Sequence, residues 1–238
     1  MSILEVRQLS KVYGDKQAFQ EVLKEINLDV DEGEFISIMG PSGSGKTTLL
    51  NVLSSIDYMT KGSITINGKQ LEKLSNKQLS DIRKKDIGFI FQDYNILNTL
   101  TVKENIMLPL SVQKLDKQIM HERYQRIVEA LNISDISDKY PSELSGGQRQ
   151  RTSAARAFIN LPSIIFADEP TGALDISTGV QILKILLEFN KKYNKTIMII
   201  THNENVAKIA NRVFYLKDGN IRKIVTNEHP ISPDEVVW

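Results

Sequence analysis

The chain has 238 residues, and its 30 Lys and Arg side chains balance 29 Asp and Glu side chains, which leaves a formal net charge of +1. This balance argues against a nucleic-acid-binding protein that relies on overall positive charge. The absence of cysteine excludes a disulfide scaffold, a thiolate zinc site and a cysteine nucleophile.

Membrane-spanning and targeting segments are not expected. The first seven residues lack the basic region and the long apolar stretch of a signal peptide. Apolar runs such as 164–167 and 197–200 are far shorter than the roughly eighteen residues that a spanning helix needs. We therefore expect a cytoplasmic protein that reaches a membrane only through a partner.

Short apolar stretches predict strands in the first and last thirds of the chain. Residues 26–30 alternate between apolar and polar, which is typical of a half-buried strand. The runs 164–167 and 196–200 are continuously apolar, as strands covered on both faces should be. Asn-Gly at 67–68 and Asp-Gly at 218–219 favour hairpin turns. Further strands are predicted at 35–39, 64–66, 213–216 and 221–225.

Helices are predicted where apolar residues recur three to five positions apart, at 119–131 and 180–190. The strand at 164–167, the helix at 180–190 and the strand at 196–200 predict a right-handed parallel crossover. We therefore expect an α/β fold. Its predicted parts are a sheet-bearing lobe at 1–92 and 160–225, a helical insertion at 93–159, and a polar tail of low order at 226–238.

The segment 40–47 matches G-x-x-x-x-G-K-[ST] at every fixed position and lies between an apolar strand and a plausible helix. Its glycines let backbone N–H groups turn toward phosphate oxygens at a helix N-terminus. Lys46 would contact the β- and γ-phosphates, and the Thr47 hydroxyl would ligate Mg²⁺. The alternative is a Gly- and Ser-rich turn with an exposed lysine, which the complete motif in this setting disfavours.

A pair of carboxylates, Asp168 and Glu169, directly follows the apolar run at 164–167. Adjacent carboxylates at the tip of a buried strand repel each other unless a cation or a hydrogen-bond partner holds them. Beside a phosphate loop, we expect Asp168 to help bind Mg²⁺ and Glu169 to act as the general base for an attacking water. The alternative is that Asp-Glu-Pro only ends a strand with surface charges.

The pentapeptide Leu-Ser-Gly-Gly-Gln at 144–148, taken with these two motifs, resembles the signature of ATP-binding-cassette (ABC) ATPases. Other positions resemble motifs of this family in the same order: Tyr13 matches the aromatic that stacks on adenine, and Gln92 the Q-loop. Residues 173–175 match the D-loop, and His202 matches the switch histidine. The resemblance implies a RecA-like core, an antiparallel β subdomain and a helical subdomain, which agrees with the lobes predicted above.

The resemblance also implies a role for each matching residue. Lys46, Glu169 and His202 would take part in ATP hydrolysis. The residues expected to hold Mg²⁺ are Thr47, Gln92 and Asp168. The residues expected to contact ATP are Tyr13, Gly40, Pro41, Ser42, Gly43, Ser44, Gly45, Lys46, Thr47, Thr48, Gln92, Ser145, Gly146, Gly147 and Gln148.

Within the ABC family, the chain is similar to the lipoprotein-release and macrolide-export branch at 91–97, 100–106, 108–110 and 140–143. The segments 151–158 and 162–167 look like ATPases of bacitracin-resistance-type antimicrobial-peptide systems of Gram-positive bacteria. This resemblance implies an ATP-hydrolysing subunit that energises a separate membrane permease for peptide resistance or export. The resemblance does not identify the transported substrate.

One phosphate loop and one signature per chain imply, through the resemblance, a head-to-tail homodimer that buries two ATP molecules. A permease helix would enter a groove near 93–110 and hold the chain on the inner face of the membrane. An alternative is a soluble ABC ATPase that acts on cytosolic machinery such as iron–sulfur assembly. A nucleotide sensor without turnover is disfavoured because both Glu169 and His202 are present. No nucleic-acid partner is expected.

Overall fold

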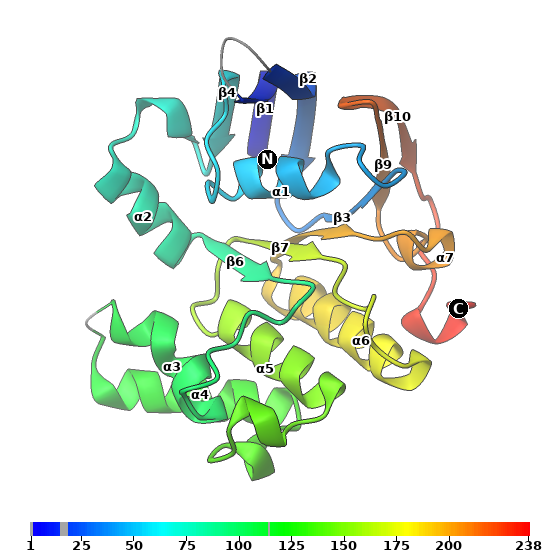
Figure 1. Cartoon of the computed structure of the whole chain (residues 1–238). Helices are drawn as coiled ribbons and strands as arrows, with labels where there is room; N and C mark the ends of the chain where they lie inside the picture. Colours follow the sequence, from blue (N-terminus) through cyan, green and yellow to red (C-terminus); the bar gives the residue numbers. More distant parts are fainter. Residues whose placement is uncertain (1, 15–18, 114) are drawn as a thin grey trace.

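A six-stranded sheet organises the chain, of which the computed structural model describes residues 2–14, 19–113 and 115–238 (Figure 1). The strand order is β10-β9-β3-β8-β7-β6, and only the hairpin partner β10 runs antiparallel to its neighbour in this described part of the chain. The carboxyl ends of the parallel strands therefore share one edge of the sheet. The strands are β3 (Phe35–Met39), β6 (Ile87–Ile90), β7 (Ile164–Asp168), β8 (Thr196–Ile200), β9 (Arg212–Lys217) and β10 (Asn220–Thr226).

A smaller antiparallel sheet covers one face of the larger one. Its strand order is β2-β1-β4-β5, and the helix α1 (Lys46–Leu53) lies between the two sheets (Figure 1). One hydrophobic cluster joins all three layers and includes Leu23 of β2, Leu50 of α1 and Ile38 of β3. The strands are β1 (Ser2–Gly14), β2 (Phe19–Asp31), β4 (Lys61–Ile66) and β5 (Lys69–Gln70), and α2 (Asn76–Lys85) follows them.

On the opposite side of the large sheet, α5 and α6 pack on its face, and α3 and α4 pack on α5 (Figure 1). A second cluster joins them to sheet residues such as Phe35 and Ile165, which alternate along their strands with members of the first cluster. At Gly88 of β6 the contact is so close that a Cβ atom would lie 2.6 Å from the Ala157 carbonyl oxygen of α5. The helices are α3 (Val102–Ser111), α4 (Lys117–Ala130), α5 (Gly146–Phe158) and α6 (Ile176–Tyr193).

This architecture confirms the predicted α/β fold with a parallel core sheet and an antiparallel β subdomain. The predicted strands at 35–39 and 196–200 coincide with β3 and β8, and both predicted hairpins form. The crossover from β7 through α6 to β8 is also present, because β7 and β8 pair in parallel. No helix among the described residues is long and apolar enough to cross a lipid bilayer.

The C-terminal segment differs from the sequence-based expectation of a polar tail with low order. Its Val236 is buried, and the Asp234 carboxylate lies 2.6 Å from the Lys184 amine on α6. A Cβ atom at Gly179 would lie 2.5 Å from the Trp238 ring, so this glycine lets the indole pack directly on α6. The expectation of low order was wrong because it rested on the polar composition of residues 226–238, whereas contacts with the distant helix α6 order this segment.

A buried amide fixes the loop that precedes α3. The Asn105 side chain accepts from the Leu97 N–H (2.7 Å) and donates to the carbonyl oxygens of Leu97 (3.0 Å), Leu100 (3.0 Å) and Thr101 (2.9 Å). Since Asn105 is fully buried, no water can replace these bonds. The conformation of residues 97–101 therefore depends on this one side chain.

We expect the substitution Asn105→Ala to lower the free energy of unfolding by about 1–3 kcal/mol, because the Leu97 N–H and the Leu97 and Leu100 carbonyl oxygens lose their side-chain partner. Urea unfolding measures this change, provided that the slope of the unfolding free energy against urea concentration is the same for both proteins. The matched substitution Asn98→Ala, at an exposed position of the same loop, should change the free energy by less than about 0.5 kcal/mol. Equal effects of the two substitutions would contradict the assignment.

Candidate functional site

The glycine-rich loop at 40–45 connects the carboxyl end of β3 to the first turn of α1. Gly40 has φ 156°, and a Cβ atom there would lie 2.0 Å from the Leu216 carbonyl oxygen. Gly43 has φ 76°, in the left-handed region that favours glycine. Gly45, at the N-cap of α1, has no side chain that could cap the helix, and the first turn carries no acidic residue. Its free N–H groups and positive dipole end therefore suit an anion.

Two polar side chains of this loop region are buried. The Lys46 amine donates to the carbonyl oxygens of Gly40 (2.9 Å) and Pro41 (3.0 Å). Burial lowers the pKa of Lys46, and the nearby carboxylates of Glu169 and Asp168 oppose this shift. The Ser44 hydroxyl is buried without a hydrogen-bond partner among the described residues. The loop therefore offers both a cation and an unused hydroxyl beside the α1 N-terminus.

Asp168 ends β7 next to the phosphate loop and is buried. Burial raises the pKa of its carboxyl, while a hydrogen bond with the Thr47 side chain lowers it. A carboxylate next to a hydroxyl is an oxygen donor set that fits Mg²⁺. Gln92 follows β6, the parallel neighbour of β7, and is exposed at the same edge of the sheet. The described residues hold no cluster of three or more His, Asp or Glu side chains with metal-binding geometry.

Glu169 and His202 form a close pair at the ends of β7 and β8. The His202 Nε2 atom lies 2.6 Å from the Glu169 Oε1 atom. Glu169 has φ 45°, in the left-handed region, and its N–H donates to the Ile200 carbonyl oxygen at 3.2 Å. A non-glycine residue in this region costs of order 1–3 kcal/mol and persists only where its surroundings fix it. The fold therefore holds this carboxylate in a defined direction, with an imidazole as its partner.

Tyr13, near the end of β1, is held by two residues that the sequence reasoning missed. Its hydroxyl donates to the Asp57 Oδ2 atom at 2.6 Å, and the Lys11 amine lies 4.5 Å from the ring centroid. The Lys11 amine also contacts the Asp57 Oδ1 atom at 2.7 Å. A hydrogen bond with the Thr48 side chain places Tyr13 beside the first turn of α1. Lys11 lies two positions before Tyr13 on the same strand face, so the sequence could have indicated this neighbour. No nearby sequence pattern indicates Asp57 as a partner of Tyr13.

The residues of the predicted signature lie apart from the phosphate loop. Ser145 caps the N-terminus of α5, where its hydroxyl accepts from the Gln148 N–H (3.3 Å) and Gln148 Oε1 accepts from the Ser145 N–H (2.9 Å). Gly146 and Gly147 begin the helix. Because α1 and α5 pack on opposite faces of the large sheet (Figure 1), Ser145–Gln148 and 40–48 are not brought together within one chain.

Comparisons with known proteins agree with this geometry. The family model "ABC transporter" matches residues 23–172. The bacitracin export ATP-binding protein BceA of Halalkalibacterium halodurans is 55% identical over 221 residues, which cover 93% of this chain and 87% of that protein. The macrolide export ATP-binding/permease protein MacB of Aggregatibacter actinomycetemcomitans is 43% identical over 93% of this chain, but this covers only 34% of MacB.

A solved structure is similar over nearly the whole fold. It is a dimeric, post-hydrolysis state of an ATP-binding cassette of Methanocaldococcus jannaschii bound to ADP and phosphate. It has a TM-score of 0.88 and 37% identity, and the match covers 95% of this chain and 99% of that one. The predicted resemblance to ABC ATPases of the bacitracin and macrolide export type is thus confirmed, and the chain belongs to the ABC transporter family as an ATP-hydrolysing cassette.

Proposed function

We propose that this chain energises a separate membrane permease that removes antimicrobial peptides or protects the cell against them. The identity of 55% to a protein named for bacitracin export carries this proposal, since it spans 87% of that protein. MacB supports the permease part, because its name joins an ATP-binding and a permease function in one protein. The chain would then lie on the inner face of the membrane through its permease.

We propose that one domain, residues 1–225, binds the nucleotide. Its sheet-bearing lobe would comprise 1–92 and 160–225, and its helical subdomain 93–159. The positions of α3, α4 and α5 within 93–159 support this division. Residues 226–238 would lie outside the domain in sequence while packing on α6.

We propose that ATP binds along the carboxyl edge of the sheet. The loop 40–45 and the first turn of α1, from Lys46 to Thr48, would hold the phosphates through N–H groups and the Lys46 amine. Thr47, Gln92 and Asp168 would hold Mg²⁺, which supplies charge neutralisation at the β- and γ-phosphates. Tyr13 would stack on the adenine ring.

Glu169 is the proposed general base. Its carboxylate would accept the proton of a water whose oxygen attacks the γ-phosphorus, while the bond from that phosphorus to the bridging oxygen breaks and ADP leaves with the electron pair. His202, at 2.6 Å from Glu169, would position the base. The 2.6 Å contact and the fixed backbone of Glu169 support this role.

A second copy of the chain would complete each site. Ser145, Gly146, Gly147 and Gln148 stand at a helix N-terminus, which suits an anion, yet they lie on the other face of the sheet from the phosphate loop. A head-to-tail dimer would bring the α5 N-terminus of one copy to the γ-phosphate of the other. The dimeric state of the similar M. jannaschii cassette supports this arrangement.

The substitution Glu169→Gln tests the base and the dimer together. We expect ATP hydrolysis to fall by about 10²- to 10⁴-fold, because the amide cannot accept the water proton. ATP binding should persist, and size-exclusion chromatography with ATP and Mg²⁺ should show a stable dimer. The matched substitution Glu129→Gln, at an exposed position of α4, should leave turnover unchanged. A monomer at saturating ATP would contradict the dimer.

Tyr13→Ala tests the adenine contact. Loss of stacking worth about 1–3 kcal/mol should raise the Kd of ATP by about 5- to 150-fold. GTP should be affected equally, because stacking does not depend on the base edge. Asp57→Ala should raise the Kd values of ATP and GTP less than Tyr13→Ala does, because it removes the hydrogen bond that orients the Tyr13 ring but keeps the ring itself. The control is Tyr58→Ala, because Tyr58 is another exposed tyrosine. If Tyr58→Ala weakens nucleotide binding as much as Tyr13→Ala, Tyr13 does not stack on the base.

A groove near the helical subdomain is the proposed permease contact. A cavity of about 480 Å³ lies between β6 and α3, and its apolar lining includes Phe89, Phe91 and Pro109. Leu97 and Leu108 also line it, and their side chains stay 45% and 38% exposed. Exposed apolar side chains around a cavity favour a protein partner. We propose that a cytoplasmic helix of the permease occupies this groove, within the predicted segment 93–110.

Fractionation of co-expressed protein tests this contact. Leu97→Asp and Leu108→Asp should each move the protein from the membrane fraction to the soluble fraction, while its ATP affinity stays unchanged. Val112→Asp is the matched control, because Val112 is exposed on the same helix end but does not line the groove. If the unaltered protein stays in the soluble fraction with its permease and instead co-purifies with a cytosolic complex, the alternative of a soluble ABC ATPase replaces this proposal.

A further inference from the structure

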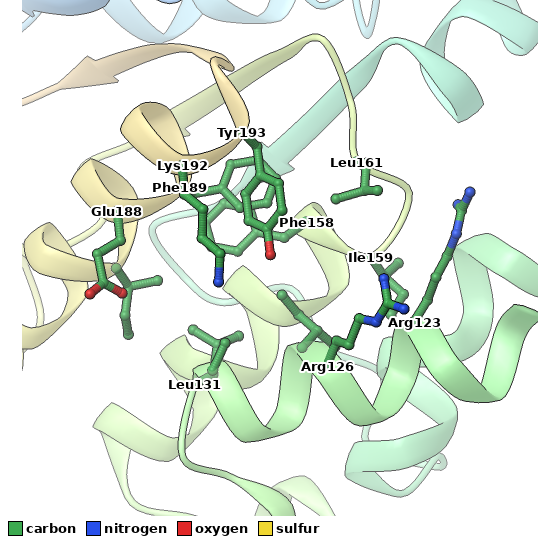
Figure 2. A pocket seen from close by; sticks show the side chains of 13 residues that line it. Arg123, Arg126, Leu131, Phe158, Ile159, Leu161, Glu188, Phe189, Lys192 and Tyr193 are labelled. Atoms are coloured by element: carbon green, nitrogen blue, oxygen red, sulfur yellow. The ribbon is translucent and has the colours of Figure 1, made fainter.

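A second cavity lies on the helical side of the sheet, between α4, α6 and the end of α5 (Figure 2). Its volume is about 100 Å³, and its base includes the rings of Phe158 and Phe189, which stack with centroids 4.2 Å apart and an interplanar angle of 11°. Leu131 and Ile159 extend the apolar lining. An apolar cavity of this order of size accepts one aromatic ring or a short acyl chain.

The mouth of this cavity also exposes apolar surface. Leu161 is 41% exposed and Tyr193 is 39% exposed, and both line the opening. Figure 2 shows the Tyr193 ring and the Lys192 side chain extending from α6 into the space toward α4. The cavity therefore continues outward between aromatic and aliphatic walls rather than closing at the protein surface.

Three cations surround the opening: Arg123 and Arg126 on α4 and Lys192 on α6. None of them forms an ion pair within the described ranges 2–14, 19–113 and 115–238. Glu188 is the one carboxylate among the described residues that line the cavity. The opening therefore carries an excess of two positive charges, which a ligand with one or two negative charges would neutralise.

We infer that this cavity binds a small anionic amphiphile, with an aromatic or acyl body and a carboxylate, sulfonate or phosphate group. The body would lie on Phe158 and Phe189, and the anionic group would contact Arg126 and Lys192. The site is separate from the ATP site, because α1 lies on the other face of the sheet. It is also separate from the groove between β6 and α3, and the inference does not depend on the proposed transport role.

Calorimetry with 8-anilino-1-naphthalenesulfonate, an anionic aromatic probe, tests the site on the full chain; its phenyl ring would enter the cavity, and its naphthalene and sulfonate would lie in the opening. We expect saturable binding of one probe per chain. The double substitution Arg126→Gln and Lys192→Gln should lower the affinity at least tenfold. The matched pair Lys191→Gln and Arg222→Gln removes the same charges from two exposed positions that do not line the cavity, and it should change the affinity less than twofold.

Two further comparisons separate charge recognition from unspecific apolar binding. N-phenyl-1-naphthylamine has the same rings without the sulfonate, and it should bind at least tenfold more weakly. Ile127→Trp adds an indole to the cavity wall without changing charge, and it should abolish binding of both probes. Unchanged ATPase activity of each variant shows that the fold is intact. No saturable binding, equal affinity for the two probes, or unchanged affinity in the cation variant would overturn the inference.

Discussion

The parallel pairing of β3, β8, β7 and β6 is the constraint on which the site depends. Their carboxyl ends lie at one edge, so the phosphate loop, His202, the two carboxylates and Gln92 meet there although they are distant in sequence. The central strands β3, β7 and β8 are buried at every residue. Close packing on both faces therefore fixes the platform from which these side chains project.

The two faces of this sheet carry different helices. One face packs against α1, which begins at the phosphate loop, whereas the helical layer that includes α5 lies on the other face. A chain built in this way cannot close its own phosphate site with its own α5.

Local chemistry was predictable from the sequence, whereas long-range contacts were not. The phosphate loop was found because eight consecutive residues define both the turn and the start of α1. Asp57 was missed because 44 residues separate it from Tyr13. The strand β1 was missed because shifts in its register, such as that between Val6 and Leu9, interrupt the alternation of apolar residues. The order of the C-terminal segment likewise depends on Trp238 meeting Gly179.

The close contact at Gly88 ties the end of α5 to β6. The helix touches β6 at its carboxyl end, and its thirteen residues place the other end roughly 20 Å away, at Ser145. A methyl group at residue 88 would clash with the Ala157 carbonyl oxygen, so β6 or the end of α5 would have to shift. If α5 yields, Ser145 at its other end moves with it, so a substitution at this small position would reach the helix N-terminus from a distance.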